Sequence, residues 1–399
     1  MSLPLPPRVD PKIWQICAGP DVKIPKIHSK VYYFPRGHLE HACSSPTAAT
    51  RTILDRYRSS IPCIVSSVDL FVDPHTDEVF AKLLLTPVTD QEPPPPVVPG
   101  QEDDDGDNLV SYVKTLTQSD CTRVLCVPIE CSNLIFPKLD LDKSQSITVT
   151  DLKNQERGYT YTYSNSSRLH TGWLNFVREK KLVANDSVVF IKNSAGKISV
   201  GIRRKTKFTT DEADEGSENL TDEIKVLDAA ELAEKNTAFD VVYYPTASGW
   251  RDFVVDAKTV DDAMKIGWKS GMRVKLPLKK YESSNSKMTI SQLKGTISFV
   301  YNHSSNVPNW RMLEVNWDGL DIPQNPNLVN PWQVEVYNIP APSTSSSTVN
   351  NPRLAESSSP QQIPHSMAGS SGPMSQAPSE VSSSAYPCNI GMQSQLGAQ

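Results

Sequence analysis

The sequence lacks the features by which membrane proteins, secreted proteins and many enzymes are recognised. No run of about 18 apolar residues is present, which argues against a membrane span. The N-terminus MSLPLPPRVD has neither the basic start nor the apolar stretch of a signal peptide. A phosphate-cradling glycine loop, a GxSxG motif and an HExxH motif are also missing. We therefore expect a non-enzymatic protein of the reducing cytosol or nucleus, whose 7 cysteines are mostly free.

Metal-binding patterns are weak. GHLEHAC places His38, His41 and Cys43 at a zinc-like spacing, but no second pair of ligands follows closely. Three further cysteines recur every five residues from Cys121 to Cys131, a spacing that matches no common zinc or redox motif. We expect neither a metal nor a cofactor.

Acidic residues are concentrated in two runs that contain no base, at 102–107 and 211–223. Without their twelve carboxylates the net charge of −5 would become +7. Between the runs, residues 112–208 contain 16 Lys and Arg against 8 Asp and Glu. A basic module is the electrostatic signature of a protein that binds polyanions, although a soluble domain with lysine-rich helix ends has the same composition.

Composition and periodicity divide the chain into segments. Short β-type runs with one helical stretch at 45–60, capped by Ser45 or Thr47, indicate a globular N-terminal part. Four consecutive prolines followed by acidic residues predict a solvated linker. Beyond about residue 341 the Ser, Pro, Gln and Gly composition predicts disorder. The expected segments are 10–90, the linker 91–111, 112–208, the acidic linker 209–223, 224–340 and the disordered tail 341–399.

The basic segment 112–208 is predicted to be a β-barrel with one or two short helices. Hairpins are expected at 146–163, turning near Lys153 and Asn154, and at 188–202. Between them, 171–183 is predicted to be a helix with Thr171 as N-cap.

The segment 224–340 is predicted to begin with a helix at 224–236 and to continue with five short strands. These strands are expected at 239–245, 273–278, 293–301, 310–317 and 332–338. A helix that interrupts them is expected to begin at Thr259, with Asp262 completing a capping box. Five strands and a helix suggest a small barrel.

Several blocks of the sequence resemble the plant auxin response factors. They include IWQICAGPDVKIPKIHSKVYYFPRGHLEHA (13–42), CIVSSVDLFVDPHTDEVFAKLLLTPV (63–88) and TGWLNFVREKKLVANDSVVFIKNSAGKISVGIRR (171–204). FDVVYYPTASGWRDFVV, WRMLEVNWD and NPWQVEV continue the match in the same order. The resemblance covers roughly residues 10–340, and the acidic and Pro-rich insertions resemble those of the divergent, short-tailed repressor branch.

The resemblance implies a mainly β fold with some α. A B3-type pseudobarrel for DNA would be inserted into an α+β dimerisation domain, followed by a Tudor-like small β-barrel. It further implies a nuclear transcription factor that binds TGTC-type auxin response elements in double-stranded DNA. Such a factor would act as a homodimer, or as a heterodimer with other auxin response factors. We expect neither a C-terminal domain of the kind that binds Aux/IAA repressors nor direct auxin control by that route, and repression is the expected effect on auxin-responsive genes.

The loops that would read DNA differ from the family pattern. The family usually has a Thr-His-Gly-Gly-Phe-Ser run within the stretch between its Ser-Asp and Val-Pro, whereas here Asp120 leads through CTRVLC to Val127, a stretch two residues shorter and without glycine. Where the family carries Arg-Gly-Gln-Pro-Arg-Arg-His, it has SNSSRLH with Arg168 as the lone arginine. Losing two arginine–guanine pairs would cost about 10²- to 10⁴-fold in sequence preference.

The resemblance still predicts DNA contacts and a dimer contact. The predicted DNA contacts are Arg123, Asn165, Ser166, Ser167, Arg168, His170, Thr171, Lys180, Lys181, Arg203 and Arg204. The predicted dimerisation residues are Ala233, Asn236 and Thr237. Loop arginines facing water and solvated helix or strand ends are the structural alternatives for the basic residues, and a helix C-cap is the alternative for Asn236. A protein that no longer reads a sequence, and that dimerises with active relatives or competes with them, is the alternative function.

Overall fold

The computed structural model describes most of the sequence up to residue 337. The described residues are 6–43, 45–88, 108–140, 142–204, 215–245, 252–281, 288–301, 307–318 and 327–337. All of these residues belong to one compact unit, Met1–Ala341. The predicted disordered tail, most of the predicted proline-rich linker and residues 205–214 lie outside the described residues. No helix within the described ranges is long and apolar enough to cross a bilayer.

The first sheet is built from strands that precede the basic segment 112–208 and strands that follow it. Its five strands, in the order β11-β3-β2-β1-β12, are all antiparallel. They are β1 (Lys30–Tyr33), β2 (Ile61–Val72), β3 (Val79–Pro87), β11 (Phe239–Tyr243) and β12 (Val254–Asp256). Because β11 and β12 come more than 140 residues after β3, the whole basic segment is an insertion into this sheet's chain path.

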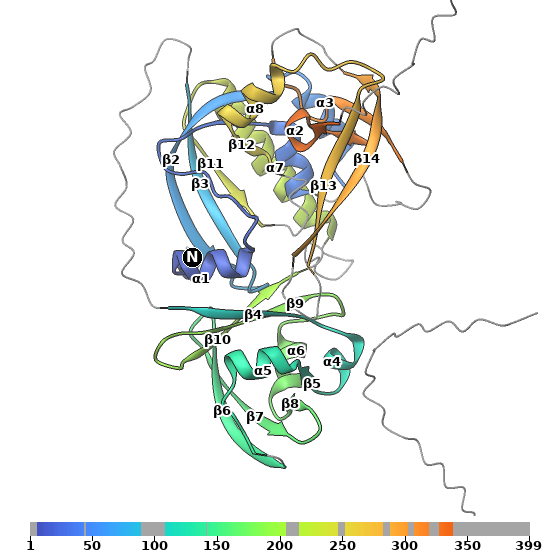
Figure 1. Cartoon of the computed structure of the whole chain (residues 1–399). Helices are drawn as coiled ribbons and strands as arrows, with labels where there is room; N and C mark the ends of the chain where they lie inside the picture. Colours follow the sequence, from blue (N-terminus) through green and yellow to red (C-terminus); the bar gives the residue numbers. More distant parts are fainter. Residues whose placement is uncertain are drawn as a thin grey trace, which may run out of the picture. The chain divides into compact units, whose positions relative to one another are not determined.

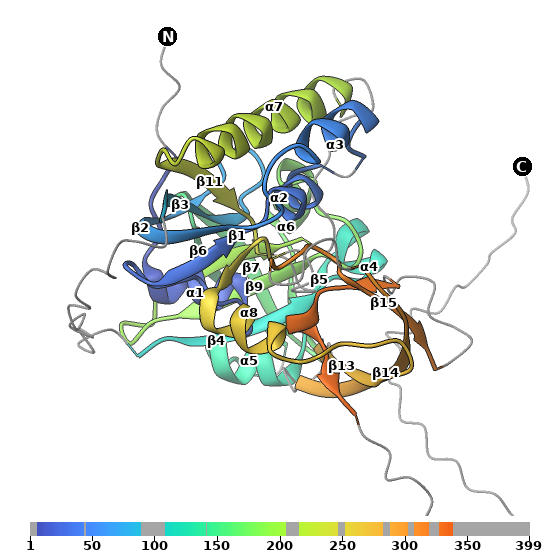
Figure 2. The same ribbon diagram turned by 90° about the horizontal axis from the view of Figure 1, so that it is seen from above.

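Five helices accompany this sheet (Figures 1 and 2). They are α1 (Pro11–Ala18), α2 (Pro35–Ala42), α3 (Ala48–Leu54), α7 (Glu215–Glu234) and α8 (Ala257–Met264). Helix α7 runs beside α2 and α3, and its buried Glu223 accepts hydrogen bonds from Thr47 and Thr50 of the α3 N-terminus. The predicted acidic linker is therefore helical from Glu215 onward, because Glu223 has partners inside the fold.

The second sheet contains seven strands in the order β4-β9-β10-β6-β7-β8-β5. They are β4 (Val110–Thr115), β5 (Leu125–Val127), β6 (Lys143–Asp151), β7 (Glu156–Tyr163), β8 (Ser167–Leu169), β9 (Ser187–Lys192) and β10 (Ile198–Arg203). Only β10 and β6 pair in parallel. Three short helices close this curled sheet, where the sequence had predicted one or two: α4 (Gln118–Thr122), α5 (Ile129–Ile135) and α6 (Trp173–Glu179). Both predicted hairpins are confirmed.

The predicted helix at 171–183 is shorter, and Thr171 is not its N-cap. Helix α6 starts at Trp173 after Gly172, which has a left-handed φ of +91°. A Cβ on Gly172 would lie 2.4 Å from the carbonyl oxygen of Gly158 on β7. Glycine is therefore required here both for its backbone conformation and for its close approach to the sheet.

The third sheet has the order β16-β15-β14-β13-β17 and is antiparallel. Its strands are β13 (Arg273–Tyr281), β14 (Met288–Val300), β15 (Leu313–Trp317), β16 (Leu328–Val329) and β17 (Glu335–Val336), with a 3-10 turn η1 (Pro331–Gln333). A separate apolar cluster lies beneath it. A closed Tudor-like barrel remains a prediction.

Three other local predictions need correction. Helix α8 begins after Asp256, whose carboxylate accepts from the Thr259 N–H, so Thr259 is inside the first turn and is not the cap. Helix α3 occupies only Ala48–Leu54 of the expected 45–60, with Thr47 as its cap. Strand β15 starts at Leu313, three residues later than expected, because Arg311 has a left-handed φ of +53°.

Candidate nucleic-acid interface

One polar face of the inserted barrel lies across β5, β8, β7 and β6. The register places Cys126 opposite Arg168, Arg168 opposite Thr162, and Thr162 opposite Ser144. Residues opposite one another in a sheet point to the same side, so these four side chains form one row. We call the face that contains this row the β5–β8 face.

His170 lies next to this row and is held in place. Its backbone N–H donates to the Thr160 carbonyl at 2.9 Å, and its Nε2 is 2.9 Å from Thr162 Oγ1. Arg168 is half-buried, and its Nε donates to Ser166 Oγ at 3.2 Å. Asn165 is exposed in the β7–β8 turn. Sequence reasoning thus correctly grouped these residues, and the face offers hydrogen-bond donors and acceptors to a ligand.

Arg123 and Thr171 belong to the two loops beside this face. Strand β5 pairs with β8 up to Leu125 opposite Leu169, so the antiparallel path brings residues 123 and 171 to the same edge. Arg123 ends α4 and is exposed, as is Thr171.

Asp120 ties these two loops together. Its carboxylate caps α4 with Thr117 and accepts from the Cys126 N–H at 3.0 Å and from Lys114 Nζ at 2.9 Å. Its carbonyl oxygen accepts from Trp173 Nε1 at 2.6 Å. The positions of both loops are therefore set by a buried hub.

Ser167 does not belong to the interface. Strand alternation turns it inward, and it is only 5% exposed. Its hydroxyl accepts from Tyr161 Oη at 3.1 Å and donates to Ser132 Oγ at 3.0 Å. The predicted DNA contact of Ser167 is therefore wrong. The polar turn ends at residue 166, and Ser167 is already the first residue of strand β8.

Lys180 is also wrongly predicted to bind phosphate. Lys180 is only 3% exposed. Its Nζ pairs with Asp77 of the β2–β3 turn and lies 3.4 Å from Asp151 Oδ2. Burial opposes the charge on Lys180, but the hydrogen bond and attraction of Asp77 outweigh it, so its pKa is raised. A buried, paired ammonium does not contact a ligand at the surface.

Arg204 is buried in the same region. Its guanidinium pairs with Asp186 at 3.1 Å and donates to the carbonyl oxygens of Lys180 at 2.5 Å and Thr76 at 3.2 Å. Its predicted phosphate contact is therefore wrong. Lys181 is exposed and its carbonyl accepts from Arg204 at 3.0 Å.

Arg203 is used to hold a helix. Its Nε and Nη2 donate to the carbonyl oxygens of Cys17 and Ile16, each at 3.0 Å. These carbonyls lie at the C-terminus of α1, where a cation is favourable. Arg203 thus connects the barrel to the first sheet's helix, which contradicts its prediction as a DNA contact.

These contacts belong to a larger junction between barrel and β2–β3 turn. Lys153 Nζ pairs with Asp77 at 2.6 Å and donates to the Pro74 carbonyl at 2.9 Å. Arg157 bridges Asp151 at 3.1 Å and Glu179 at 2.6 Å. The hydrogen bond from Arg157 lowers the pKa of Glu179 to about 2. We call this network, including Lys180 and Arg204, the ionic joint.

Ser144 is a candidate contact that sequence reasoning missed. It is exposed on β6 and lies directly opposite Thr162 in the row that contains Arg168, whereas its neighbour Lys143 lies opposite Tyr163, in the row of the buried Ser167. The predicted hairpin register, counted outward from its turn near Lys153, is the signal that locates it.

The predicted dimerisation residues differ in accessibility. Ala233 is completely buried in the first sheet's core, which contradicts a direct contact. Asn236 follows α7 with a left-handed φ of +54°, so its interpretation as a helix C-cap is supported, and its side chain accepts from Arg58 at 3.3 Å. Thr237 is exposed.

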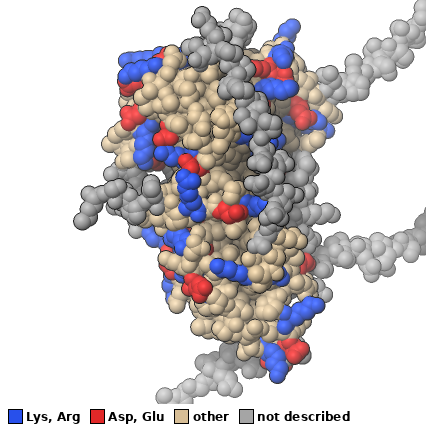
Figure 3. Space-filling model, turned by 90° about the vertical axis from the view of Figure 1, so that its left-hand side faces the viewer, with Lys and Arg blue, Asp and Glu red and all other residues tan. Residues whose placement is uncertain are grey.

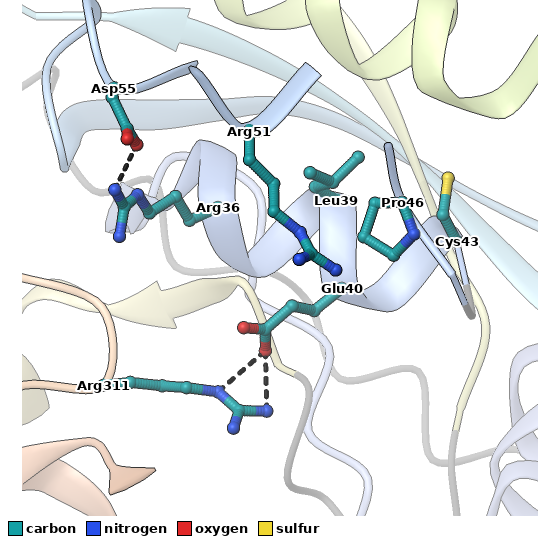
Figure 4. Close-up of a pocket in the computed structure, with 8 residues that line it drawn as sticks. All are labelled: Arg36, Leu39, Glu40, Cys43, Pro46, Arg51, Asp55 and Arg311. Atoms are coloured by element: carbon teal, nitrogen blue, oxygen red, sulfur yellow. Dashed lines mark hydrogen bonds and ion pairs between the residues drawn. The ribbon is translucent and has the colours of Figure 1, made fainter. Parts of the chain in front are cut away.

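A hollow of about 430 Å³ lies between α2, α3 and Arg311 (Figure 4). Arg36 pairs with Asp55, and Arg311 makes a two-pronged ion pair with Glu40, at 2.9 and 2.8 Å. The arginines that line the hollow are thus partly neutralised by carboxylates. On the face shown in Figure 3, blue and red atoms are also interspersed.

Comparisons with known proteins agree with this architecture. The profile of the B3 DNA binding domain matches residues 112–206, which contain the seven-stranded sheet. The profile of the auxin response factor ancillary domain matches residues 253–338. The structure of an Arabidopsis FUS3–DNA complex is 18% identical and covers 24% of this chain and 97% of that chain, with a TM-score of 0.22.

The curated relatives extend the likeness beyond both domains. Auxin response factor 17 of Arabidopsis thaliana is 36% identical over 82% of this chain and 62% of its own length. Auxin response factor 16 of the same plant is 38% identical over 84% of this chain and 57% of its length. Auxin response factor 8 of Oryza sativa subsp. japonica is 35% identical over 85% and 54%.

The inserted barrel is therefore a B3 DNA-binding domain. The chain belongs to the auxin response factor family and spans somewhat more than half the length of these relatives.

Proposed function

We propose that this protein is a nuclear, DNA-binding regulator of auxin-responsive genes, as the names of its relatives suggest. Its β5–β8 face would contact TGTC-type elements in double-stranded DNA through Arg168, Arg123, His170, Thr171, Asn165 and Ser166. One observation carries the proposal. Arg168 lies in the polar row of the β5–β8 face and His170 lies beside it, and both flanking loops are hydrogen-bonded to Asp120.

The same geometry favours a smaller contribution of phosphate contacts to affinity, whereas the proposed weakening of sequence preference rests on the arginines that the recognition loops lack. Three basic residues that could have bound phosphate are instead used inside the fold, namely Lys180, Arg203 and Arg204. Each phosphate contact steepens the dependence of affinity on salt, so fewer contacts predict a shallow salt slope. Repression is the expected sign of regulation, and a homodimer or a heterodimer with another auxin response factor is the expected assembly, with Thr237 and Asn236 near the contact.

The topology supports a proposal for the domain boundaries. We propose a dimerisation domain formed by 10–90 and the beginning of 224–340, interrupted by the B3 domain at 112–208. The ancillary domain contains the third sheet.

The test is fluorescence anisotropy of the full chain with a paired TGTC duplex and with a scrambled duplex of equal length, at several salt concentrations. We expect a tens-fold preference for the element that is reduced in R168A and unchanged in K197A, an exposed lysine of the β9–β10 turn. Equal affinity for both duplexes would refute sequence reading. It would leave the alternative, a protein that dimerises with active relatives without reading DNA.

A further inference from the structure

The end of β14 turns two aromatic side chains toward solvent. Earlier in the strand, Leu293, Gly295 and Ile297 point into the core. A β-bulge between Ile297 and Phe299 then shifts the register against β15. An extra residue reverses the in–out alternation, and bulges often re-aim side chains in this way. Phe299 is consequently 54% exposed and Tyr301 40% exposed.

These two rings form a corner with a carboxylate. Their centroids are 4.7 Å apart and their planes meet at 62°, an edge-to-face pair. Glu314 is paired with Phe299 across the strands, and its Oε2 accepts from Tyr301 Oη at 2.8 Å. The carboxylate is thus held beside two exposed aromatic surfaces.

Three aromatic rings elsewhere in the described chain lie beneath cations of the same chain. Arg8 lies over Phe71, Arg157 over Phe176 and Lys294 over Tyr337, with the Lys294 nitrogen 4.6 Å from the Tyr337 centroid. None of these three cations lies over Phe299 or Tyr301. At the third sheet, the ring of Tyr337 is therefore covered by Lys294 of the same chain, whereas the rings of Phe299 and Tyr301 face solvent.

We propose that Phe299, Tyr301 and Glu314 form a docking surface for an arginine side chain of a partner protein. A guanidinium is planar, so it stacks on an aromatic face while its N–H groups donate to a carboxylate. The negative charge of Glu314 repels phosphate, which disfavours a nucleic acid as occupant. The proposal does not depend on the proposed DNA function, because the corner belongs to a different sheet.

The experiment measures binding of the full chain to the fluorescein-labelled peptide Gly-Gly-Arg-Gly-Arg-Gly-Gly. The matched control peptide carries citrulline, which has nearly the same shape as arginine but no charge. F299L keeps an apolar side chain and removes the ring, and E314Q removes the charge. E335Q is the control variant, because Glu335 is an exposed carboxylate of the same sheet that pairs with Lys275 at 2.9 Å.

We expect the arginine peptide to bind several-fold more tightly than the citrulline peptide. F299L and E314Q should each weaken it by about two- to five-fold, the size of an exposed cation–π contact, and E335Q should not. Attraction by other acidic parts of the chain would be equal in all variants. Absence of binding, equal binding of both peptides, or an F299L protein that binds like wild type would overturn the proposal. A melting curve confirms that each variant is folded.

Discussion

The two ends of the B3 barrel use charge in opposite ways. At the ionic joint, Lys180 and Arg204 are buried and paired with carboxylates. At the β5–β8 face, Arg168 and Arg123 reach the surface and the neighbouring groups are Thr, Ser and His. Basic residues thus stabilise the fold at one end of the barrel and are available to a ligand at the other. Clustered basic residues in a sequence do not by themselves show which use applies.

The joint also shows why the barrel cannot be treated as an isolated insertion. Val189 and Ile191 of β9 belong to the same apolar cluster as α1 and the first sheet. A Cβ on Gly201 would lie 2.4 Å from the sulfur of Cys17, so β10 approaches α1 closely. The apolar contact excludes water around the charges and strengthens their interactions.

The largest expected effect is on the joint. Replacing Asp77 by Asn keeps the left-handed backbone at φ +56° that Asn also tolerates. It removes the carboxylate that pairs with buried Lys180 and with Lys153, so D77N should lower the free energy of unfolding by about 3–5 kcal/mol. Urea denaturation of the full chain measures this. K258Q, which breaks the exposed Lys258–Asp262 pair, is the control and should leave the urea midpoint almost unchanged.

Glu78 gives the joint a pH dependence. Burial raises its pKa to about 7, although Arg204 partly offsets this. A carboxyl group whose folded pKa is raised contributes stability below its unfolded pKa, near 4.5, and loses it as pH rises through 7. E78Q should therefore be more stable than wild type at pH 8, by up to about 3 kcal/mol, and nearly equal at pH 4.5. Urea titrations at both pH values test this, and an equal gain at both would contradict a protonation effect.

A smaller effect is expected from the recognition end. R168A should leave the melting temperature within a degree or two, because Arg168 is half-buried and, within the described part of the chain, its side chain hydrogen-bonds to Ser166. Discrimination between the TGTC element and a scrambled duplex should fall by about 1–3 kcal/mol, roughly 5- to 150-fold. If instead the melting temperature fell and discrimination between the duplexes did not, Arg168 would stabilise the fold as the residues of the ionic joint do. The contrast between the two ends of the barrel would then be wrong.

The smallest expected effect concerns the orientation of His170. T162V removes the hydroxyl that lies 2.9 Å from His170 Nε2, at a cost of about 0.5–1.5 kcal/mol in DNA affinity. Anisotropy measurements on the same duplex detect it. T148V, which alters an exposed residue of the neighbouring strand, is the control. Equal losses in both variants would indicate a general effect of the sheet surface.

The candidate site was predictable where the local pattern decided the outcome. The hairpin at 146–163 and the polar turn before Arg168 were recognised from turn residues and alternation. The N-cap of α6 was not, because the close approach of Gly172 to Gly158 depends on two strands meeting. Ser167 was misplaced by one residue, which in a strand is enough to turn a side chain from outside to inside.

The sequence by itself determined the two hairpins of the B3 domain, the inserted arrangement and the family, because these depend on periodicity, turn residues and long matching blocks. Only the tertiary structure decided which basic residues are available to a ligand. Asp77 is more than 100 residues from Lys180 in the chain, and Cys17 is 186 residues from Arg203. Whether a charge is buried with a partner or left at the surface depends on such distant contacts, which no local pattern encodes.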